Sequence, residues 1–496
     1  MGQEAAGGTR LSTGIDGLDE ILAGGFERDR LYLLQGVPGS GKTTMALQFL
    51  LDGLRRDEVV LYVTLSETRE ELRVAAASHG WGLDGMHVHE LAPLGDQLDP
   101  EAQYTMFHPS EVELSQTTTR ILEDVERLRP RRVVFDSLSE IRLLSGSALR
   151  FRRQMLALKQ YFVGRGATVL LIDEQQGARD GMHMHTIVHG AIELEQMRPE
   201  FGGDRRRLRV TKMRGWDFRS GNHDYVIETG GVRVFPRLVA AEHRRDGDNS
   251  PVTSNLPALD ALLGGGLDRG TSTLLIGAAG TGKSSLAAHF VMAACERGER
   301  AAMFLFDESL RAMLSRSRGM GFDMEGCIES GMVTARQVDP AELSPGEFIQ
   351  HIRDSVEQDD ARVVVIDSLN GFVNAMPEEQ FVIVQLHELL AYLGQLGVVT
   401  ILINAQQGLI GQMSSSVDVS YLADTVILFR YYEDRGRVRQ ALSVLKKRTG
   451  AHERTIRELR ISDDGLHIGE PLVHYRGVLT GVPHEVHDPA PGPDGR

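Results

Sequence analysis

The chain has 496 residues, of which 41% are hydrophobic and 25% charged, proportions that suit a folded protein of two or three domains. Its net charge of −15 repels nucleic acid and anionic lipid, so neither is an expected partner. The sequence has no apolar run long enough to span a membrane and no signal peptide, so we expect a cytoplasmic protein. With only two cysteines, Cys295 and Cys327, we expect free or buried thiols and no disulfide framework.

Short apolar runs alternate with helical patterns through the first half of the chain. The predicted order is a strand at 31–36, a helix at 43–54, and further strands at 59–67, 131–137 and 168–176. Because these strands are apolar along their whole length, we expect helices to cover both faces of the sheet. The pattern predicts an α/β fold with a mostly parallel sheet.

The second half of the chain repeats the first. The stretch that begins at Leu11 aligns with the one that begins at Val252, and Lys42 and Lys283 are likewise 241 residues apart. Residues that match further along the two halves keep the same order, but the offset between the copies is about ten residues shorter there. Two domains of one fold explain these matches, whereas the repeats of a solenoid are far shorter.

We place the two domains at residues 1–245 and 246–496. The polar stretch 242–251 is rich in turn-forming residues and is the predicted linker. From about residue 484 onward proline and glycine dominate, which predicts a disordered tail.

The pattern G-x-x-x-x-G-K-[ST] occurs twice, at 36–43 and at 277–284, each time between a predicted strand and a predicted helix. Such a loop cradles phosphates with its main-chain amides and with the amino-terminal end of the helix. The alternative is a glycine-rich surface turn, which two matched copies disfavour. We expect the residues that bind ATP in the two cradles to be Gly36, Gly39, Ser40, Gly41, Lys42, Thr43, Thr44, Gly277, Gly280, Thr281, Gly282, Lys283, Ser284 and Ser285.

A carboxylate that helps to hold Mg²⁺ should follow an apolar strand. Asp136 and Asp367 stand in that position, and we expect each to act with the cradle hydroxyl of its own half, Thr43 or Ser284. The alternative is an ordinary aspartate at the end of a strand.

Hydrolysis also needs a group that deprotonates or orients water. Glu67 and Glu308 each lie 25 residues after the cradle lysine, at the end of a strand predicted to neighbour the cradle strand. Asp307 precedes Glu308 and gives the second half a pair of carboxylates. The alternative is that these residues are acids at helix amino termini. We expect Glu67, Asp307 and Glu308 to be catalytic, together with the two cradle lysines.

The motifs "TGIDGLDEILAGGF", "VTLSET" and "FDSLSE" resemble the KaiC family over nearly the whole chain. The resemblance implies two fused RecA-like domains in a two-tiered homo-hexameric ring, with Mg-ATP between neighbouring subunits. It also implies an ATPase whose second tier phosphorylates its own serine or threonine side chains, in a circadian clock or other signalling system.

In the KaiC family a Lys-x-Arg element from the neighbouring subunit contacts each nucleotide. Lys212 and Arg214 match it in the first half, and Lys446 and Arg448 in the second. Such cations would stabilise charge on the transferring phosphoryl group. The alternative is a solvated basic strand.

The chain departs from the family pattern at the residues that accept phosphate. Ser420 matches the family's serine, but Tyr421 stands where threonine is usual, and Ser415 falls where a further threonine lies. Ser420 and Ser415 are therefore the candidate phosphoacceptors, with an interface role as the alternative. The segment that binds the partner KaiA is short here, which argues against KaiA as a partner and leaves open a KaiB-like or other signalling protein.

Gln175 and Gln406 end apolar strands in the two halves, and in RecA-like folds such a glutamine senses the γ-phosphate. A plain polar residue at a strand end is the alternative.

Two other functions fit the same fold. One is a recombinase or helicase whose ATPase depends on DNA; the acidic charge and the lack of paired basic, glycine-rich loops disfavour it. The other is a scaffold that binds ATP without hydrolysing it, which the two complete sets of motifs disfavour.

Overall fold

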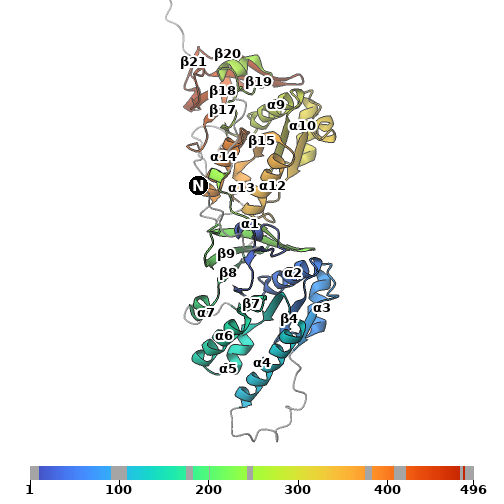
Figure 1. Ribbon diagram of the computed structural model, residues 1–496. Helices are drawn as coiled ribbons and strands as arrows, with labels where there is room; N and C mark the ends of the chain where they lie inside the picture. Colours follow the sequence, from blue (N-terminus) through green and yellow to red (C-terminus); the bar gives the residue numbers. More distant parts are fainter. Residues whose placement is uncertain are drawn as a thin grey trace, which may run out of the picture. The chain divides into compact units, whose positions relative to one another are not determined.

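The computed structural model describes residues 10–90, 109–174, 182–199, 202–242, 250–374, 382–406, 420–480 and 484–485. The chain divides into two compact units, Met1–Arg237 and Leu238–Arg496, and each is built around its own sheet (Figure 1). In this part of the chain no helix is both long and apolar enough to cross a bilayer.

The sheet of the first unit has nine strands among the residues described. Their spatial order is β11-β10-β9-β8-β3-β7-β6-β4-β5. The strands β3 to β8 pair in parallel. The strands β9, β10 and β11 extend the sheet beside β8 and pair antiparallel. The strands are β3 (Leu31–Gly36), β4 (Val60–Thr64), β5 (His87–Glu90), β6 (Arg132–Asp136), β7 (Thr168–Glu174), β8 (Gly190–Met197), β9 (Arg205–Met213), β10 (Asn222–Glu228) and β11 (Gly231–Phe235).

Helices cover both faces of this sheet, and each face has its own apolar core. One core is formed with α1, α2 and α3, and the other with α4, α5 and α6. A separate two-stranded sheet joins β1 (Arg10–Leu11) to β2 (Phe26–Glu27). The helices are α1 (Leu18–Ile21), α2 (Lys42–Arg55), α3 (Arg69–Ser78), α4 (Pro109–Leu128), α5 (Leu138–Ser145), α6 (Ala148–Phe162) and α7 (Met182–Ile187).

The second unit repeats this plan in the order β14-β13-β15-β16-β12-β17-β18-β19-β20. Its first six strands in that order are parallel and the rest antiparallel. The strands are β12 (Ser272–Gly277), β13 (Arg300–Leu305), β14 (Val333–Gln337), β15 (Ala361–Asp367), β16 (Val399–Ala405), β17 (Thr425–Asp434), β18 (Arg437–Lys447), β19 (Arg457–Ser462) and β20 (Gly465–Pro471).

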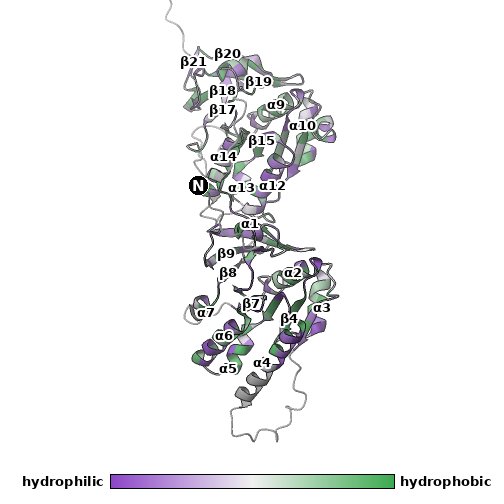
Figure 2. Cartoon of the chain, viewed as in Figure 1, coloured by the Kyte–Doolittle hydropathy of each residue, from purple (hydrophilic) through white to green (hydrophobic). Residues whose placement is uncertain are grey.

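Helices again lie on both faces of the second sheet, over two apolar cores. The central strands are hydrophobic, whereas the helices around them carry both hydrophobic and hydrophilic residues (Figure 2). A small sheet of β21 (Tyr475–Arg476) and β22 (His484–Glu485) follows. The helices are α8 (Pro257–Leu262), α9 (Lys283–Glu296), α10 (Leu310–Gly319), α11 (Met324–Glu329), α12 (Pro345–Glu357), α13 (Leu369–Asn374) and α14 (Val382–Gln395).

The prediction of two mostly parallel α/β domains is confirmed. The sequence prediction was wrong about one neighbour. The strand before Glu67, β4, lies beside β6 and not beside the cradle strand β3, which β7 and β8 flank. In the second unit β13 likewise lies beside β15. β3 and β4 are separated because β6 and β7, which come later in the chain, insert between them.

The expectation of free thiols was also wrong. Cys295 and Cys327 form a disulfide, since the end of α9 and the helix α11 bring them together. Cys295 corresponds to Leu54 in the first unit, but α11 has no counterpart there, because residues 79–86 form no helix. The duplication therefore gave no indication of the pair.

Candidate nucleotide-binding sites

The first cradle connects β3 to α2. Gly39 and Gly41 have φ angles of 82° and 88°, in the left-handed region that favours glycine. Lys42 is the first residue of α2, and its Nζ donates to the carbonyl oxygens of Gly36 at 2.9 Å and Val37 at 3.0 Å. Burial lowers the pKa of Lys42, and the charges of nearby carboxylates oppose that shift. The lysine thus lies across a loop whose turns expose main-chain amides to an anion.

The second cradle connects β12 to α9 in the same way. Gly280 and Gly282 have φ angles of 77° and 98°. Lys283 Nζ donates to the carbonyl oxygens of Gly277 at 3.0 Å and Ala278 at 2.6 Å. Burial lowers the pKa of Lys283 to about 8.

The other predicted cradle residues shape the loops. The carbonyl of Ser40 accepts from the Tyr225 hydroxyl at 2.6 Å, and Thr281 Oγ1 donates to the Ala278 carbonyl at 2.8 Å. A side chain at Gly36 would place its Cβ 2.5 Å from Ser40 Oγ, so the first cradle closes only around glycine. Thr44 Oγ1 lies 3.5 Å from His79, and Ser285 is buried in α9.

Each cradle lies beside the aspartate predicted for it. Thr43 Oγ1 donates to Asp136 Oδ2 at 3.0 Å, and the Tyr62 hydroxyl donates to the same oxygen at 2.6 Å. Burial raises the pKa of Asp136, while the hydrogen bonds from Tyr62 and Thr43 lower it. In the second unit burial likewise raises the pKa of Asp367, which a hydrogen bond from Ser284 lowers.

The residues present fit a hydrated Mg²⁺ ion. Asp367 Oδ2 is buried without a hydrogen-bond partner among the described residues, and the Ser284 hydroxyl lowers the pKa of its carboxyl. A buried oxygen of this kind needs a donor or a cation. Oxygen ligands from a hydroxyl and a carboxylate are the type that Mg²⁺ prefers.

Glu67 lies three residues beyond β4. The hydroxyl of Thr64 donates to the Glu67 carbonyl at 2.7 Å and accepts from the Glu67 amide at 3.0 Å, which fixes the turn. Helix α3 begins after Thr68, whose side chain forms a capping box with Glu71. Glu67 therefore precedes the cap and is not an acid of the first helical turn. Burial, and then the nearby charges of Asp136 and Glu71, raise its pKa.

Glu308 occupies the matching place before Ser309, the cap of α10. Here the carboxylate has a strong partner, because Arg316 Nη1 donates to both of its oxygens, to Oε1 at 2.6 Å. Asp307 is exposed and accepts a hydrogen bond from the Ser368 hydroxyl. The two predicted bases thus differ in their surroundings.

The two Lys-x-Arg elements lie at the opposite end of the sheet from the cradle of their own unit. Lys212 is level with Leu33, whereas Leu208 is level with Gly36, where the cradle begins. Arg214 continues beyond Lys212, and its guanidinium donates to the Thr186 carbonyl at 2.9 Å.

The second unit repeats this placement. Lys446 is level with Leu274, near the start of the cradle strand β12. Its Nζ donates to the carbonyl oxygens of Ser420 at 3.0 Å and Ala423 at 2.7 Å. Arg448 donates to the Tyr421 carbonyl at 2.8 Å. The structure thus brings this element to the segment that contains the candidate phosphoacceptor Ser420.

Two of the predicted residues lie outside the described residues, namely Ser415 and Gln175. Gln406 is described, and its main-chain amide donates to the Gly277 carbonyl at 2.9 Å. The Gln406 Oε1 atom is buried without a partner among the described residues. This glutamine therefore lies at the second cradle with an unused polar atom.

A hollow of about 470 Å³ adjoins the second cradle. It lies between the start of α9, the end of α10 and the turn that joins β19 to β20. Cradle residues line one side of it, so the space suits the rest of a nucleotide whose phosphates bind the cradle. The lining residues are Gly280, Gly282, Lys283, Ser284, Ser285, Arg316, Gly319, Met320, Ile461, Ser462 and Asp463.

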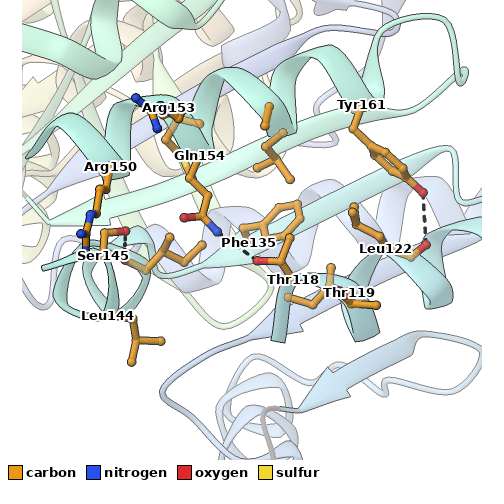
Figure 3. A pocket seen from close by; sticks show the side chains of 15 residues that line it. Thr118, Thr119, Leu122, Phe135, Leu144, Ser145, Arg150, Arg153, Gln154 and Tyr161 are labelled. Atoms are coloured by element: carbon orange, nitrogen blue, oxygen red, sulfur yellow. Dashed lines mark hydrogen bonds between the residues drawn. The ribbon is translucent and has the colours of Figure 1, made fainter. Parts of the chain in front are cut away.

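A larger hollow of about 720 Å³ lies between α4, α5 and α6 of the first unit (Figure 3). Gln154 donates to Thr118 Oγ1 at 3.1 Å, and the Tyr161 hydroxyl donates to the Leu122 carbonyl at 3.1 Å, so α6 is tied to α4 across it. None of the residues that line this hollow belongs to a cradle, so it is separate from the nucleotide site.

Sequence reasoning missed two side chains at the sites. Tyr62 was treated as one apolar residue of its strand, although a tyrosine hydroxyl in a buried strand needs a partner and indicates a polar group nearby. Arg316 was missed because its counterpart at the same spacing is Ala75, so the repeat gave no match.

A phosphate cradle at the end of a parallel strand, with its lysine and with a strand-end aspartate beside the cradle hydroxyl, occurs in both units. This fold and these two sites define a tandem RecA-like P-loop ATPase. A sequence model of the KaiC ATPase matches residues 11–239 and 252–473. The chain belongs to the KaiC family, as the resemblance predicted.

Several circadian clock oscillator proteins named KaiC are similar to the chain along nearly its whole length. The protein of Parasynechococcus marenigrum (strain WH8102) is 29% identical over 488 residues, covering 96% of this chain and 93% of its own. That of Synechococcus elongatus (strain ATCC 33912 / PCC 7942 / FACHB-805) is 29% identical over 488 residues, with 96% and 92% covered. That of Thermostichus vulcanus is 28% identical over 496 residues, with 98% and 93% covered.

Proposed function

We propose that the protein hydrolyses Mg-ATP at both cradles and works as a homo-hexameric ring with ATP between neighbouring subunits. The observation that carries the proposal is that both units place a lysine across the cradle and a hydroxyl against a buried aspartate. Membership of the KaiC ATPase family supports the same reaction.

In the proposed reaction the cradle amides and the lysine bind the β- and γ-phosphates. Thr43 with Asp136, and Ser284 with Asp367, would hold Mg²⁺, which when bound neutralises charge on the phosphate oxygens. The glutamate of each half accepts a proton from water, the water oxygen bonds to the γ-phosphorus, and the bond to the β–γ bridging oxygen breaks to release ADP. The raised pKa of Glu67 suits a group that must accept a proton.

The position of the Lys-x-Arg elements supports a shared site. Lys212 is level with Leu33, which precedes Gly36 by three residues in β3. At the usual rise of a strand, Lys212 is therefore about 10 Å from the level of Gly36. Arg214 lies further still from that cradle, which supports a role for both side chains at the nucleotide of a neighbouring subunit. Lys446 and Arg448 would do the same in the second tier.

The second unit would also transfer phosphate to its own serine side chains, at Ser420 or Ser415. Lys446 holds the Ser420 carbonyl at 3.0 Å, which ties the candidate acceptor to a predicted nucleotide contact. The names of the relatives favour a role in timekeeping. A KaiB-like or other signalling protein is the proposed partner.

Variants of the two glutamates test hydrolysis. The double variant Glu67→Gln, Glu308→Gln should bind a fluorescent ATP analogue but lose roughly a hundredfold or more of its phosphate release. Full turnover in that variant would refute both bases.

Mixed rings test the trans contact. Lys42→Ala subunits and Arg214→Ala subunits, each inactive in the first tier, should recover part of their hydrolysis when mixed, because some interfaces then have both residues intact. Native mass spectrometry of the same samples would give the number of subunits. A mixture no more active than its components would rule out the shared site.

Transfer to serine is tested by intact-mass spectrometry after incubation with Mg-ATP. We expect a gain of phosphate that is reduced in Ser420→Ala and abolished in Glu67→Gln, Lys283→Ala. A wild-type chain that gains no phosphate would remove the autokinase from the proposal while leaving the ATPase in place.

A further inference from the structure

We propose that Arg316 is a positioning residue that restrains Glu308 and so slows hydrolysis at the second cradle. The inference rests on the proposed function, because Glu308 is the proposed base of the second half. It concerns a contact inside one chain, which the first half does not have.

The contact occupies the whole carboxylate. Arg316 Nη1 donates to both oxygens of Glu308, and the two side chains are 25% and 23% exposed, so solvent screens the pair only in part. The remaining donors of the guanidinium, Nε and Nη2, are buried without a partner among the described residues. The bond to Glu308 is therefore the one that fixes the guanidinium within that part of the chain.

A restrained carboxylate is a poor base for water. To contact water, an oxygen of Glu308 must give up an ionic hydrogen bond to Arg316. Arg316 also lines the hollow beside Lys283 and Ser284, and the charges of Arg316 and Glu308 both act on Asp367. The restraint thus lies beside Asp367, the carboxylate proposed to hold Mg²⁺ at the second cradle.

The first half has the same elements without the restraint. Helices α3 and α10 have ten residues each and align at the spacing of the two cradles, which puts Ala75 at the position of Arg316. The Glu67 carboxylate makes no hydrogen bond or ion pair to any of the residues that the structure describes. The two halves can therefore be compared within one chain, because Arg316 holds the carboxylate of Glu308 and no described residue holds that of Glu67.

The test measures each half alone at saturating Mg²⁺. In a Glu67→Gln background, hydrolysis that disappears on adding Glu308→Gln belongs to the second half. Arg316→Ala in that background should raise kcat roughly two- to fivefold, the factor expected from removing one partly screened ion pair, and should change KM by a smaller factor. Arg318→Ala is the matched control, because Arg318 is on the same helix and pairs with the exposed Glu325.

The reciprocal variant keeps the test decisive if Arg316→Ala does not fold. Ala75→Arg in a Glu308→Gln background should lower the kcat of the first half by a similar factor, with binding of a fluorescent ATP analogue retained. A kcat that is unchanged or reduced in a folded Arg316→Ala protein, or unchanged in Ala75→Arg, would overturn the inference. The proposed function itself fails if Glu67→Gln and Glu308→Gln each hydrolyse ATP no faster than the double variant does. That outcome is distinguishable from failure of the Arg316 inference alone.

Discussion

The Tyr62 hydroxyl donates to Asp136 Oδ2 at 2.6 Å, and this is the oxygen that the cradle hydroxyl of Thr43 also reaches, at 3.0 Å. The second half has Met303 at the place of Tyr62, and Asp367 Oδ2 has no partner among the described residues. The two aspartates that would help to hold Mg²⁺ are thus supported differently. The duplication preserved the acid and changed what surrounds it.

The first prediction concerns Tyr62→Phe. Asp136 must be ionised to act on Mg²⁺, burial already raises its pKa, and the Tyr62 hydrogen bond lowers it. Removal of the hydroxyl should raise the pKa further, so activity should begin to fall at a higher pH as the solution is acidified. The pH–rate profile of the first half, taken in a Glu308→Gln background, measures this shift. Tyr32→Phe, which removes a hydroxyl bonded to Glu27, is the control that should not move the profile.

The second prediction is a pH dependence of ATP binding at the second cradle. The pKa of Lys283 is about 8 in the nucleotide-free protein, because the ammonium is buried. A bound phosphate favours the charged form, so binding above that pH must take up a proton. Affinity should therefore be level below pH 8 and fall with rising pH above it, by up to about tenfold per pH unit.

A fluorescent ATP analogue titrated into Lys42→Ala protein from pH 7 to pH 9.5 would report the second cradle alone. Lys283→Arg is the control, since a guanidinium stays charged throughout this range. Equal affinity at pH 7 and pH 9.5 in the Lys42→Ala protein would contradict the prediction.

The third prediction concerns a buried arginine in the first unit. Arg132 is fully buried, and its guanidinium pairs with Asp52 at 2.9 Å and Glu58 at 2.6 Å. Arg132→Met leaves those carboxylates without their buried partner and should lower the free energy of unfolding by about 3 kcal/mol or more. Arg127→Ala, which removes an arginine that is 67% exposed, should change it by less than about 1 kcal/mol.

Both tryptophans, Trp81 and Trp216, lie in the first unit, so urea unfolding followed by tryptophan fluorescence reports this unit in the full chain. In the second unit Ala293 and Val363 stand where Asp52 and Arg132 do. The double variant Asp52→Ala, Arg132→Val should therefore recover part of the lost stability. The account is contradicted if the double variant loses more free energy of unfolding than Asp52→Ala and Arg132→Val lose when their separate effects are added.

The parts of the site that were predictable from sequence are those that one stretch of chain forms by itself. The first cradle takes its glycines, its lysine and its hydroxyl from eight consecutive residues, so the motif determines the geometry. Asp136 was found because a carboxylate after an apolar strand must lie at the carboxyl edge of the sheet, where the cradle also lies.

What the sequence did not indicate depends on contacts between elements. The place of β4 next to β6 follows from how the chain crosses the sheet, and an apolar strand gives no sign of its neighbour. The Arg316–Glu308 contact joins the second turn of α10 to the residue before its cap, and its arginine is absent from the other repeat. Matched spacing finds what both halves share, so it cannot find what only one of them has.

The last prediction concerns the disulfide, which the sequence reasoning excluded. Cys295 is in the last turn of α9, the helix that begins with Lys283, and the bond to Cys327 closes a loop across 32 positions. Closing a loop of that length restricts the unfolded chain and should stabilise the second unit by about 3–4 kcal/mol. Reduction should therefore speed hydrogen exchange in peptides from α9 while leaving those from α2 unchanged. Cys295→Leu, which introduces the residue found at Leu54, should match the reduced protein with or without reductant.

Alkylation under denaturing conditions checks the bond itself, because we expect no added groups before reduction and two after it. Two added groups without reductant would show that the thiols are free and that the original expectation was right.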